Sequence, residues 1–256
     1  MQTIILAGGL GTRLAEETEV RPKPLVEVGP QPILWHILKH YSHYNHNEFF
    51  IALGYKGEMI KRYLLDYSNL NSLTTIDMTS GKVVSDQSNC EPWIVHLIDT
   101  GQNTNTGGRV KRLASNIKKE PFFLTYGDGV SNVDLNELLK FHRSQKKMVT
   151  ITAVRPPARF GGLEFDGDLV VKFTEKPQTG EGWINGGFMV CEPEIMDMLN
   201  ADLSSLEADA LDQLAKTNQI AAYRHFGFWQ CMDTLRDKRL LEQLWQSGNA
   251  PWKTWE

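Results

Sequence analysis

The sequence predicts an α/β fold with a mostly parallel, mixed sheet flanked by helices. Short apolar runs, which resemble buried strands, alternate with stretches of helical period up to about residue 155. Such alternation is typical of βαβ units, in which a helix carries the chain back and the next strand lies parallel to the last. Beyond that point the pattern changes, although no linker, repeat or low-complexity tract separates two units. We therefore expect a single domain over residues 1–256 with an elaborated second half.

The spacing of apolar residues gives the type of each element. In the first half, apolar runs predict strands over 3–7, 49–53, 94–98, 122–126 and 149–154, and helical spacing predicts helices over 32–46, 58–67, 109–117 and 133–145. Asn132 or Asp134 is the expected N-cap of the last of these helices. In the second half, we expect strands over 169–173, 188–190 and 220–224, and helices over 195–199, 208–215 and 235–245.

Composition excludes several classes of protein. The chain has 27 basic and 31 acidic side chains and a net charge of -4, which argues against a nucleic-acid binder with a basic face. Its three cysteines, Cys90, Cys191 and Cys231, are far apart, so neither a disulfide framework nor a zinc site is expected. The first apolar run is too short for a signal peptide, and no run approaches a membrane span. We expect a cytoplasmic protein that binds neither nucleic acid nor membrane.

A glycine-rich loop follows the first predicted strand. Residues 6–13 read Leu-Ala-Gly-Gly-Leu-Gly-Thr-Arg, and glycine allows a ligand oxygen to come close to main-chain N–H groups. No Gly-Lys-Ser/Thr follows, and the glycine spacing does not match a dinucleotide fingerprint. Arg13 adds a guanidinium suited to bidentate contact with phosphate. The loop therefore indicates a phosphate site; the alternative is a tight strand-to-helix turn that needs glycine.

Lys23 lies between two prolines in the sequence Arg21-Pro22-Lys23-Pro24. Each proline fixes its own φ and favours an extended conformation in the residue before it, so the backbone that carries Lys23 is stiff. We interpret Lys23 as a cation aimed at the same phosphate site. A solvated lysine in a rigid loop is the alternative.

Two aspartates are candidate metal ligands. Asp128 lies between two glycines after the strand predicted over 122–126, where open α/β sheets bind ligands. Asp233 directly precedes the predicted C-terminal helix. Carboxylate oxygens are hard donors suited to Mg²⁺. An ordinary Asp-Gly turn is the alternative for Asp128, and a helix N-cap is the alternative for Asp233.

These motifs together resemble the sugar-phosphate nucleotidylyltransferases. The pattern Leu-x-Gly-Gly-x-Gly-Thr-Arg-Leu over 6–14, followed by Lys23-Pro24, is similar to the signature of that family. The rest of the chain resembles the glucose-1-phosphate cytidylyltransferases within it. The stretches that carry this resemblance are 32–36 (Pro-Ile-Leu-Trp-His), 54–57 (Gly-Tyr-Lys-Gly), 99–101 (Asp-Thr-Gly), 106–109 (Thr-Gly-Gly-Arg), 125–129 (Thr-Tyr-Gly-Asp-Gly), 228–230 (Phe-Trp-Gln) and 251–256 (Pro-Trp-Lys-Thr-Trp-Glu).

The resemblance implies a Rossmann-like fold of the nucleotide-diphospho-sugar transferase type, with a nucleotide-binding half over 1–130 and a sugar-binding and oligomerisation half over 131–256. It implies a homo-oligomer that uses Mg²⁺ to transfer a cytidylyl group from CTP to α-D-glucose 1-phosphate, giving CDP-glucose and pyrophosphate. It also implies a place in the supply of deoxysugars for surface polysaccharide such as lipopolysaccharide O-antigen. Cytidine rests on the resemblance, because no physical feature of the sequence selects the base.

The resemblance also implies roles for individual residues. It makes Arg13, Lys23 and Asp128 catalytic and gives the metal to Asp128 and Asp233. The implied nucleotide-binding residues are Leu6, Ala7, Gly8, Gly9, Leu10, Gly11, Thr12, Arg13, Lys23, Thr104 and Arg109. The implied sugar-phosphate residues are Glu175, Lys176, Asn185 and Gly186. The plainer alternatives are a loop leading into a helix around 104–109 and an exposed turn at 175–177.

Some features stand outside this interpretation. Cys231 replaces an expected proline, and residues 207–210 replace an expected proline-containing acidic stretch. His36, His40 and His43 have metal-ligand spacing, but we interpret them as a partly exposed helix face, since no Glu adjoins the first histidine. The competing functions are a uridylyl- or thymidylyltransferase, a catalytically silent nucleotide-sugar-binding regulatory subunit and, more distantly, a NAD-binding protein.

Overall fold

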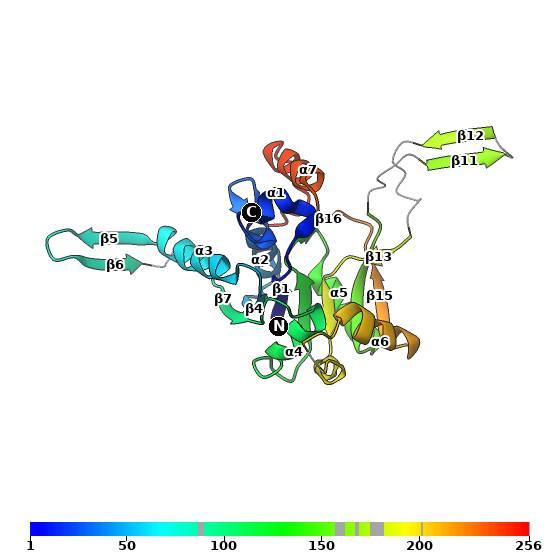
Figure 1. Ribbon diagram of the computed structural model, residues 1–256, viewed down its shortest axis with the longest axis horizontal. Helices are drawn as coiled ribbons and strands as arrows, with labels where there is room; N and C mark the ends of the chain where they lie inside the picture. Colours follow the sequence, from blue (N-terminus) through cyan, green and yellow to red (C-terminus); the bar gives the residue numbers. More distant parts are fainter. Residues whose placement is uncertain (87–89, 157–161, 167–168, 175–181, 201, 256) are drawn as a thin grey trace.

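The computed structural model describes residues 1–256 except 87–89, 157–161, 167–168, 175–181, 201 and 256 (Figure 1). At its centre is an eight-stranded sheet with the order β13-β10-β14-β8-β1-β4-β7, and β15 pairs with β10. The strands of this sheet are β1 (Gln2–Leu6), β4 (Glu48–Leu53), β7 (Ile94–Asp99), β8 (Phe122–Tyr126), β10 (Val149–Val154), β13 (Ile184–Asn185), β14 (Met189–Cys191) and β15 (Ile220–Arg224).

The first half of the chain builds the parallel part of this sheet. β1 pairs in parallel with β4 and with β8, and β4 pairs in parallel with β7. The second half adds β14, which runs antiparallel to β8, and β10, which runs antiparallel to β14 but parallel to β15. The predicted mixed and mostly parallel α/β sheet is therefore confirmed. Because the four parallel strands end at one edge, the loops that follow them meet there.

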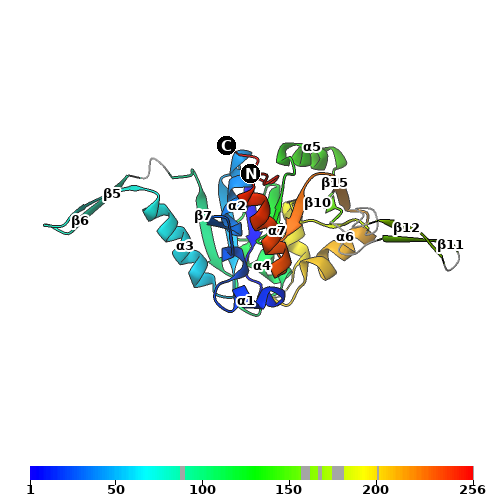
Figure 2. The same cartoon turned by 90° about the horizontal axis from the view of Figure 1, so that it is seen from above.

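Helices cover both faces of the sheet (Figure 2). On one face, α2 (Ile33–His43), α5 (Leu135–Gln145), α7 (Leu235–Gln246) and the C-terminal Trp252 and Trp255 belong to one buried cluster. On the other, α4 (Thr106–Leu113) packs with the helical turns over Pro193–Met198 and Leu206–Leu211. Side chains of β1 alternate between the two clusters, as expected for a strand buried on both faces. None of the described helices combines the length and apolar character of a membrane span.

Short elements complete the fold and position the loops. Near the N-terminus these are η1 (Thr12–Leu14), α1 (Ala15–Thr18), η2 (Lys23–Leu25), β2 (Glu27–Val28), β3 (Gln31–Pro32) and α3 (Gly57–Leu70). Two hairpins, β5 (Leu73–Asp77) with β6 (Lys82–Asp86) and β11 (Gly162–Asp166) with β12 (Leu169–Thr174), project from the body on opposite sides (Figure 1). Later in the chain come β9 (Gly129–Ser131), β16 (Trp229–Cys231) and α6 (Asp212–Lys216).

Several expected boundaries are corrected by tertiary packing. The helix expected over 109–117 is α4, which begins at Thr106 although Gly107 and Gly108 have poor helix propensity. A Cβ at Gly108 would lie 2.4 Å from the Asp202 carbonyl oxygen, so close packing against the 202–206 segment requires glycine there. The helix expected over 195–199 is a 3₁₀ helix over Pro193–Met198, and the one expected over 208–215 is a π-helix over Leu206–Leu211 followed by α6.

Candidate active site

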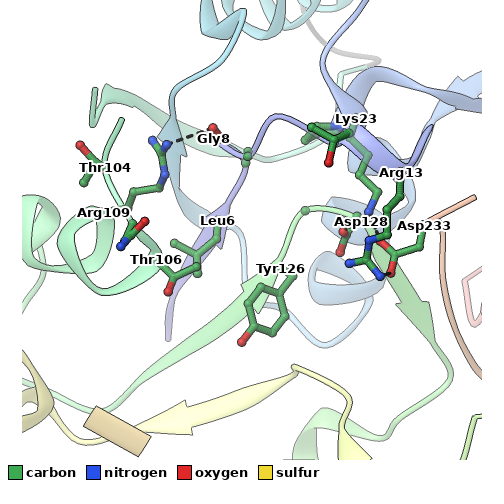
Figure 3. A pocket seen from close by; sticks show the side chains of 17 residues that line it. Leu6, Gly8, Arg13, Lys23, Thr104, Thr106, Arg109, Tyr126, Asp128 and Asp233 are labelled. Carbon is green, nitrogen blue, oxygen red and sulfur yellow. Dashed lines mark hydrogen bonds and ion pairs between the residues drawn. The ribbon is translucent and has the colours of Figure 1, made fainter. Parts of the chain in front are cut away.

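A cavity of about 360 Å³ lies where β1 and β8 end (Figure 3). Its lining includes most of the predicted nucleotide and metal residues: Leu6, Ala7, Gly8, Gly9, Gly11, Thr12, Arg13, Lys23, Thr104, Arg109, Asp128 and Asp233. Leu10 is absent from this lining and is 51% exposed. Of the predicted sugar residues, Asn185 lies on β13 and Gly186 directly follows it, and neither lines this cavity. Glu175 and Lys176 lie outside the described residues.

At one end of the cavity, a lysine joins the two candidate metal ligands. Lys23 Nζ donates to Asp128 Oδ2 at 2.6 Å and also to Asp233 Oδ1. Arg13 Nη1 contacts Asp233 Oδ2 at 2.9 Å. Burial disfavours the charged lysine, but the carboxylates of Asp128 and Asp233 outweigh burial and raise the pKa of Lys23. These four side chains therefore form one charged cluster, which we call the Lys23 cluster.

The pairing of β9 with β16 brings the two aspartates together from distant parts of the sequence. Cys231 is paired with Gly129, and the Met232 N–H donates to the Asp128 carbonyl at 2.8 Å. Asp128 directly precedes β9 and Asp233 comes shortly after β16, so both aspartates lie at the same end of this two-stranded sheet. Burial raises the pKa of Asp233. The ammonium of Lys23 and the guanidinium of Arg13 outweigh burial, so the pKa of Asp233 is lowered overall.

Asp233 is not the N-cap of α7. Thr234 is the N-cap, and its hydroxyl and the Asp237 carboxylate form a capping box. The alternative interpretation of Asp233 as an N-cap is therefore wrong. The Asp233 carboxylate contacts Lys23 and Arg13 instead. Asp134, in contrast, does cap α5, because its carboxylate accepts the N–H groups of Asn136 and Glu137.

The glycine loop forms the wall between the two ends of the cavity. Gly11 has a φ of 64°, a left-handed conformation that favours glycine, and Thr18 Oγ1 donates to its carbonyl at 3.1 Å. The Gly8 carbonyl accepts the Tyr55 N–H at 3.2 Å, which ties the loop to the end of β4. At Gly9, an added Cβ would meet nothing within 4 Å, so the protein itself leaves space above that residue.

At the other end of the cavity, Arg109 is buried and donates to five groups of the protein. Its Nη1 donates to the carbonyls of Leu53 and Gly101 at 3.0 and 2.7 Å and to Thr100 Oγ1 at 2.8 Å. Its Nη2 donates to the carbonyls of Gly8 and Gln102 at 3.0 and 3.2 Å, and Figure 3 shows the contact with Gly8. Burial lowers the pKa of Arg109. The guanidinium thus joins the ends of three parallel strands.

The Lys23 cluster has the donor set that Mg²⁺ prefers. Mg²⁺ usually binds proteins through one or two carboxylates and completes its shell with substrate phosphates and water. Asp128 and Asp233 fit that requirement, because both reach one ammonium nitrogen. Within the described ranges, no group of three or more His, Cys, Asp or Glu side chains could hold a metal ion.

The three histidines of α2 do not share a site. His36 and His40 are buried, which corrects the expectation of a partly exposed face, whereas His43 is exposed. His36 Nε2 lies 2.9 Å from the Val28 carbonyl, and His40 Nδ1 lies 3.3 Å from Thr254 Oγ1. Burial lowers the pKa of His36 to about 4 and that of His40 to about 3, so both are neutral at pH 7.

Comparison with protein families matches residues 2–233 to the nucleotidyl transferase family. The chain belongs to this family. It is 48% identical over 257 residues to a glucose-1-phosphate cytidylyltransferase of Salmonella typhi, and 40% identical over 256 residues to a probable glucose-1-phosphate cytidylyltransferase of Bacillus subtilis. Each alignment covers 100% of both chains.

Solved structures share the fold of this nucleotidyl transferase. HddC from Yersinia pseudotuberculosis superposes with a TM-score of 0.70 at 23% identity, covering 95% of this chain and 99% of that one. UDP-glucose pyrophosphorylase in complex with UDP-glucose superposes with a TM-score of 0.68 at 17% identity, covering 96% and 98%. At these identities the likeness shows the fold alone, which is the expected nucleotide-diphospho-sugar transferase type.

Sequence reasoning missed three side chains of this nucleotidyl transferase that meet beside the cavity. The Tyr126 hydroxyl donates to Glu207 Oε1 at 2.7 Å, and the Thr106 hydroxyl donates to Glu207 Oε2 at 2.6 Å. Tyr126 and Thr106 line the cavity. Burial raises the pKa of Glu207, but the hydrogen bonds from Thr106 and Tyr126 reverse that effect and lower it overall. Thr106 and Tyr126 lie in two of the stretches that carry the family resemblance, and Glu207 lies in the departure noted at 207–210, but none of the three was singled out.

Proposed function

We propose that the protein transfers a cytidylyl group from CTP to α-D-glucose 1-phosphate, forming CDP-glucose and releasing pyrophosphate. The observation that carries the proposal is the Lys23 cluster, in which two carboxylates and two cations meet beside a glycine loop. Phosphoryl-type transfer asks a protein mainly for positioning and for charge stabilisation, and this cluster offers both. The full-length similarity to glucose-1-phosphate cytidylyltransferases supports the choice of substrates.

In this reaction an oxygen of the sugar phosphate attacks the α-phosphorus of CTP in line, and pyrophosphate leaves. The attacking phosphate is already ionised near pH 7, so no general base is required. Arg13, whose side chain is 72% exposed, is placed to contact the leaving pyrophosphate and its developing charge. Lys23 holds the triphosphate, and the main-chain N–H groups of residues 8–11 contact its oxygens.

Mg²⁺ is the cofactor we propose. Asp128 and Asp233 would hold it, and when bound it supplies positive charge that neutralises the phosphate oxygens. The protein groups then have separate tasks: the two carboxylates fix the ion, and Arg13 and Lys23 contact the phosphates from the protein side. Arg109 keeps the three strand ends in place rather than adding another free charge.

The sugar side of the proposal is carried by the second half of the chain. Glu175 and Lys176 would contact the hexose hydroxyls and the attacking phosphate, and Asn185 and Gly186 would complete the sugar site. We assign nucleotide binding mainly to residues 1–130 and sugar binding and subunit contacts to 131–256, although Asp233 of the second half lines the same cavity. A homo-oligomer in the cytoplasm that supplies CDP-sugars for surface polysaccharide completes the proposal.

A pyrophosphate-release assay tests the proposal directly. Purified protein is incubated with glucose 1-phosphate, MgCl₂ and, in separate reactions, CTP, UTP, dTTP or ATP. We expect CTP to give the highest kcat/KM. Higher kcat/KM with UTP or dTTP would identify the uridylyl- or thymidylyltransferase alternative instead. Absence of pyrophosphate with all four, together with CTP binding in a titration, would identify a silent binding subunit.

A further inference from the structure

Tyr126 occupies a special position at the end of β8. It is the last residue of that strand and directly precedes Gly127 and Asp128, and its side chain lines the cavity apart from the Lys23 cluster (Figure 3). An added Cβ at Gly187 would lie 3.1 Å from the Tyr126 ring, so the turn after β13 packs closely against it. Tyr126 therefore stands between the charged end of the cavity and the sugar side.

The hydroxyl proton of Tyr126 is already used by the protein. It is donated to Glu207 Oε1 at 2.7 Å, and an ionised carboxylate can only accept. Glu207 is itself fixed, because its other oxygen accepts from Thr106 at 2.6 Å and from Ser205 at 3.0 Å. The Tyr126 oxygen can therefore still accept a hydrogen bond, but it has no further proton to donate. Among the residues that the structure describes, its partner in the acceptor role is weak, since Asn185 Nδ2 lies 3.4 Å away.

This hydrogen-bond direction restricts what Tyr126 can bind. Phosphate oxygens near pH 7 are acceptors, so they gain nothing from an oxygen that offers no proton. A ligand hydroxyl is a donor and fits. The Asn185 side chain that faces Tyr126 is held by the Gly187 N–H, which donates to its Oδ1 at 3.0 Å. The weak contact from Asn185 therefore places β13 on the acceptor side of the Tyr126 oxygen.

We propose that Glu207 is a positioning residue that holds the Tyr126 oxygen as an acceptor for one hydroxyl of the hexose 1-phosphate. The inference rests on the proposed function for the identity of the substrate. Tyr126 contacts the sugar directly, and Glu207 acts through Tyr126. The pair therefore contributes to sugar affinity and to discrimination among sugars, whereas the Lys23 cluster acts on the phosphates.

The test compares Tyr126→Phe, Glu207→Ala and Glu207→Gln with the wild type in steady-state pyrophosphate release. Loss of one such hydrogen bond, about 1–1.5 kcal/mol, corresponds to roughly a tenfold rise in KM for glucose 1-phosphate. We expect that rise in Tyr126→Phe and Glu207→Ala, with KM for CTP within about twofold. Glu207→Gln should remain close to wild type, because its amide oxygen can still accept the Tyr126 proton.

Asp209→Asn is the matched control. Asp209 lies on the same helical turn, but its carboxylate accepts the Ser205 N–H at 2.7 Å instead of contacting the cavity. Its KM values should match the wild type. Thermal unfolding of every variant accompanies the kinetics, and the double variant Tyr126→Phe/Glu207→Ala should lose no more sugar affinity than either single variant, since both remove one interaction.

A series of deoxy analogues of glucose 1-phosphate identifies the hydroxyl. One analogue should be a poorer substrate than glucose 1-phosphate for the wild type, and Tyr126→Phe should no longer distinguish the two. A wild-type KM for glucose 1-phosphate in Tyr126→Phe would overturn the inference, as would a rise confined to CTP, which would place the contact on the ribose. If the wild type does not use glucose 1-phosphate, the proposed function is wrong, and the inference that depends on that substrate is wrong as well. If Glu207→Ala does not fold, Tyr126→Phe with the analogue series decides.

Discussion

Both ends of the cavity contain cationic side chains, but their hydrogen-bond partners differ. At one end, Lys23 and Arg13 contact carboxylates, and Arg13 is largely exposed. At the other, Arg109 is 5% exposed and its terminal nitrogens donate to four carbonyls and one hydroxyl. A cationic side chain with N–H groups still available can donate to a ligand. One whose N–H groups already donate to the protein stabilises the backbone instead. The glycine loop around Arg13 indicated phosphate contact for that residue, whereas only the family resemblance implied nucleotide binding for Arg109.

The largest effect should follow from removing a carboxylate of the Lys23 cluster. Asp128→Asn keeps the shape of the side chain but loses its charge, and we expect kcat to fall by about 10²–10³-fold or more. The variant should unfold at the wild-type temperature within a few degrees. The measurement is pyrophosphate release with CTP and glucose 1-phosphate. Asp66→Asn, an exposed carboxylate on α3, serves as the control, and full turnover in Asp128→Asn would remove that residue from the mechanism.

Arg13→Ala tests the free cation at the same end. We expect a loss of about 10²-fold in kcat/KM, because the guanidinium contacts charge that develops on the leaving pyrophosphate. Stability in urea should change little, since the Arg13 side chain is 72% exposed and Asp233 keeps its contact with Lys23. Arg21→Ala, which breaks the ion pair between Arg21 and Glu27 of β2, should leave both quantities near wild type. An equal loss of stability and activity in Arg13→Ala would mean that Arg13 supports the fold instead.

Arg109→Lys tests the opposite end. A lysine has three donors and no planar fork, so it cannot replace the contacts to the three strand ends. We expect a loss of about 2–4 kcal/mol in the free energy of unfolding, measured by urea denaturation. Arg112→Lys, on the exposed side of α4 and paired with Asp202, should change stability far less. If Arg109→Lys kept wild-type stability but lost CTP affinity, direct contact with the nucleotide would be the better interpretation.

The smallest expected effects are those of alanine substitutions at two neighbouring residues of the glycine loop, Gly8 and Gly9. A Cβ at Gly8 would lie 2.2 Å from Arg109 Nη1, so Gly8→Ala should lower the unfolding temperature. A Cβ at Gly9 would meet nothing within 4 Å of the protein, so Gly9→Ala should keep its unfolding temperature. We expect Gly9→Ala to raise KM for CTP by about tenfold, because the methyl group occupies space that the phosphates need. Unchanged KM in Gly9→Ala would move the triphosphate away from this loop.

Local sequence predicted the parts of the site that local backbone geometry determines. The glycine loop and the proline-bracketed Lys23 could be located because glycine adopts conformations that other residues avoid, and proline fixes its own φ and restricts the residue before it. Asp233 joins Lys23 across 210 residues through the pairing of β9 with β16, and only resemblance indicated that meeting. Tyr126 and Glu207 are 81 residues apart, and their contact depends on a π-helix that no propensity predicts.

The Lys23 cluster is also the place where the account can be tested most directly. Crystals of the protein soaked with MnCl₂ and CTP, without glucose 1-phosphate, would show the ion by anomalous scattering and the unreacted triphosphate beside it. We predict one Mn²⁺ peak bonded to carboxylate oxygens of both Asp128 and Asp233, with the triphosphate in contact with Lys23 and Arg13. A peak that leaves either aspartate uncoordinated, or a triphosphate bound away from the two cations, would contradict the account.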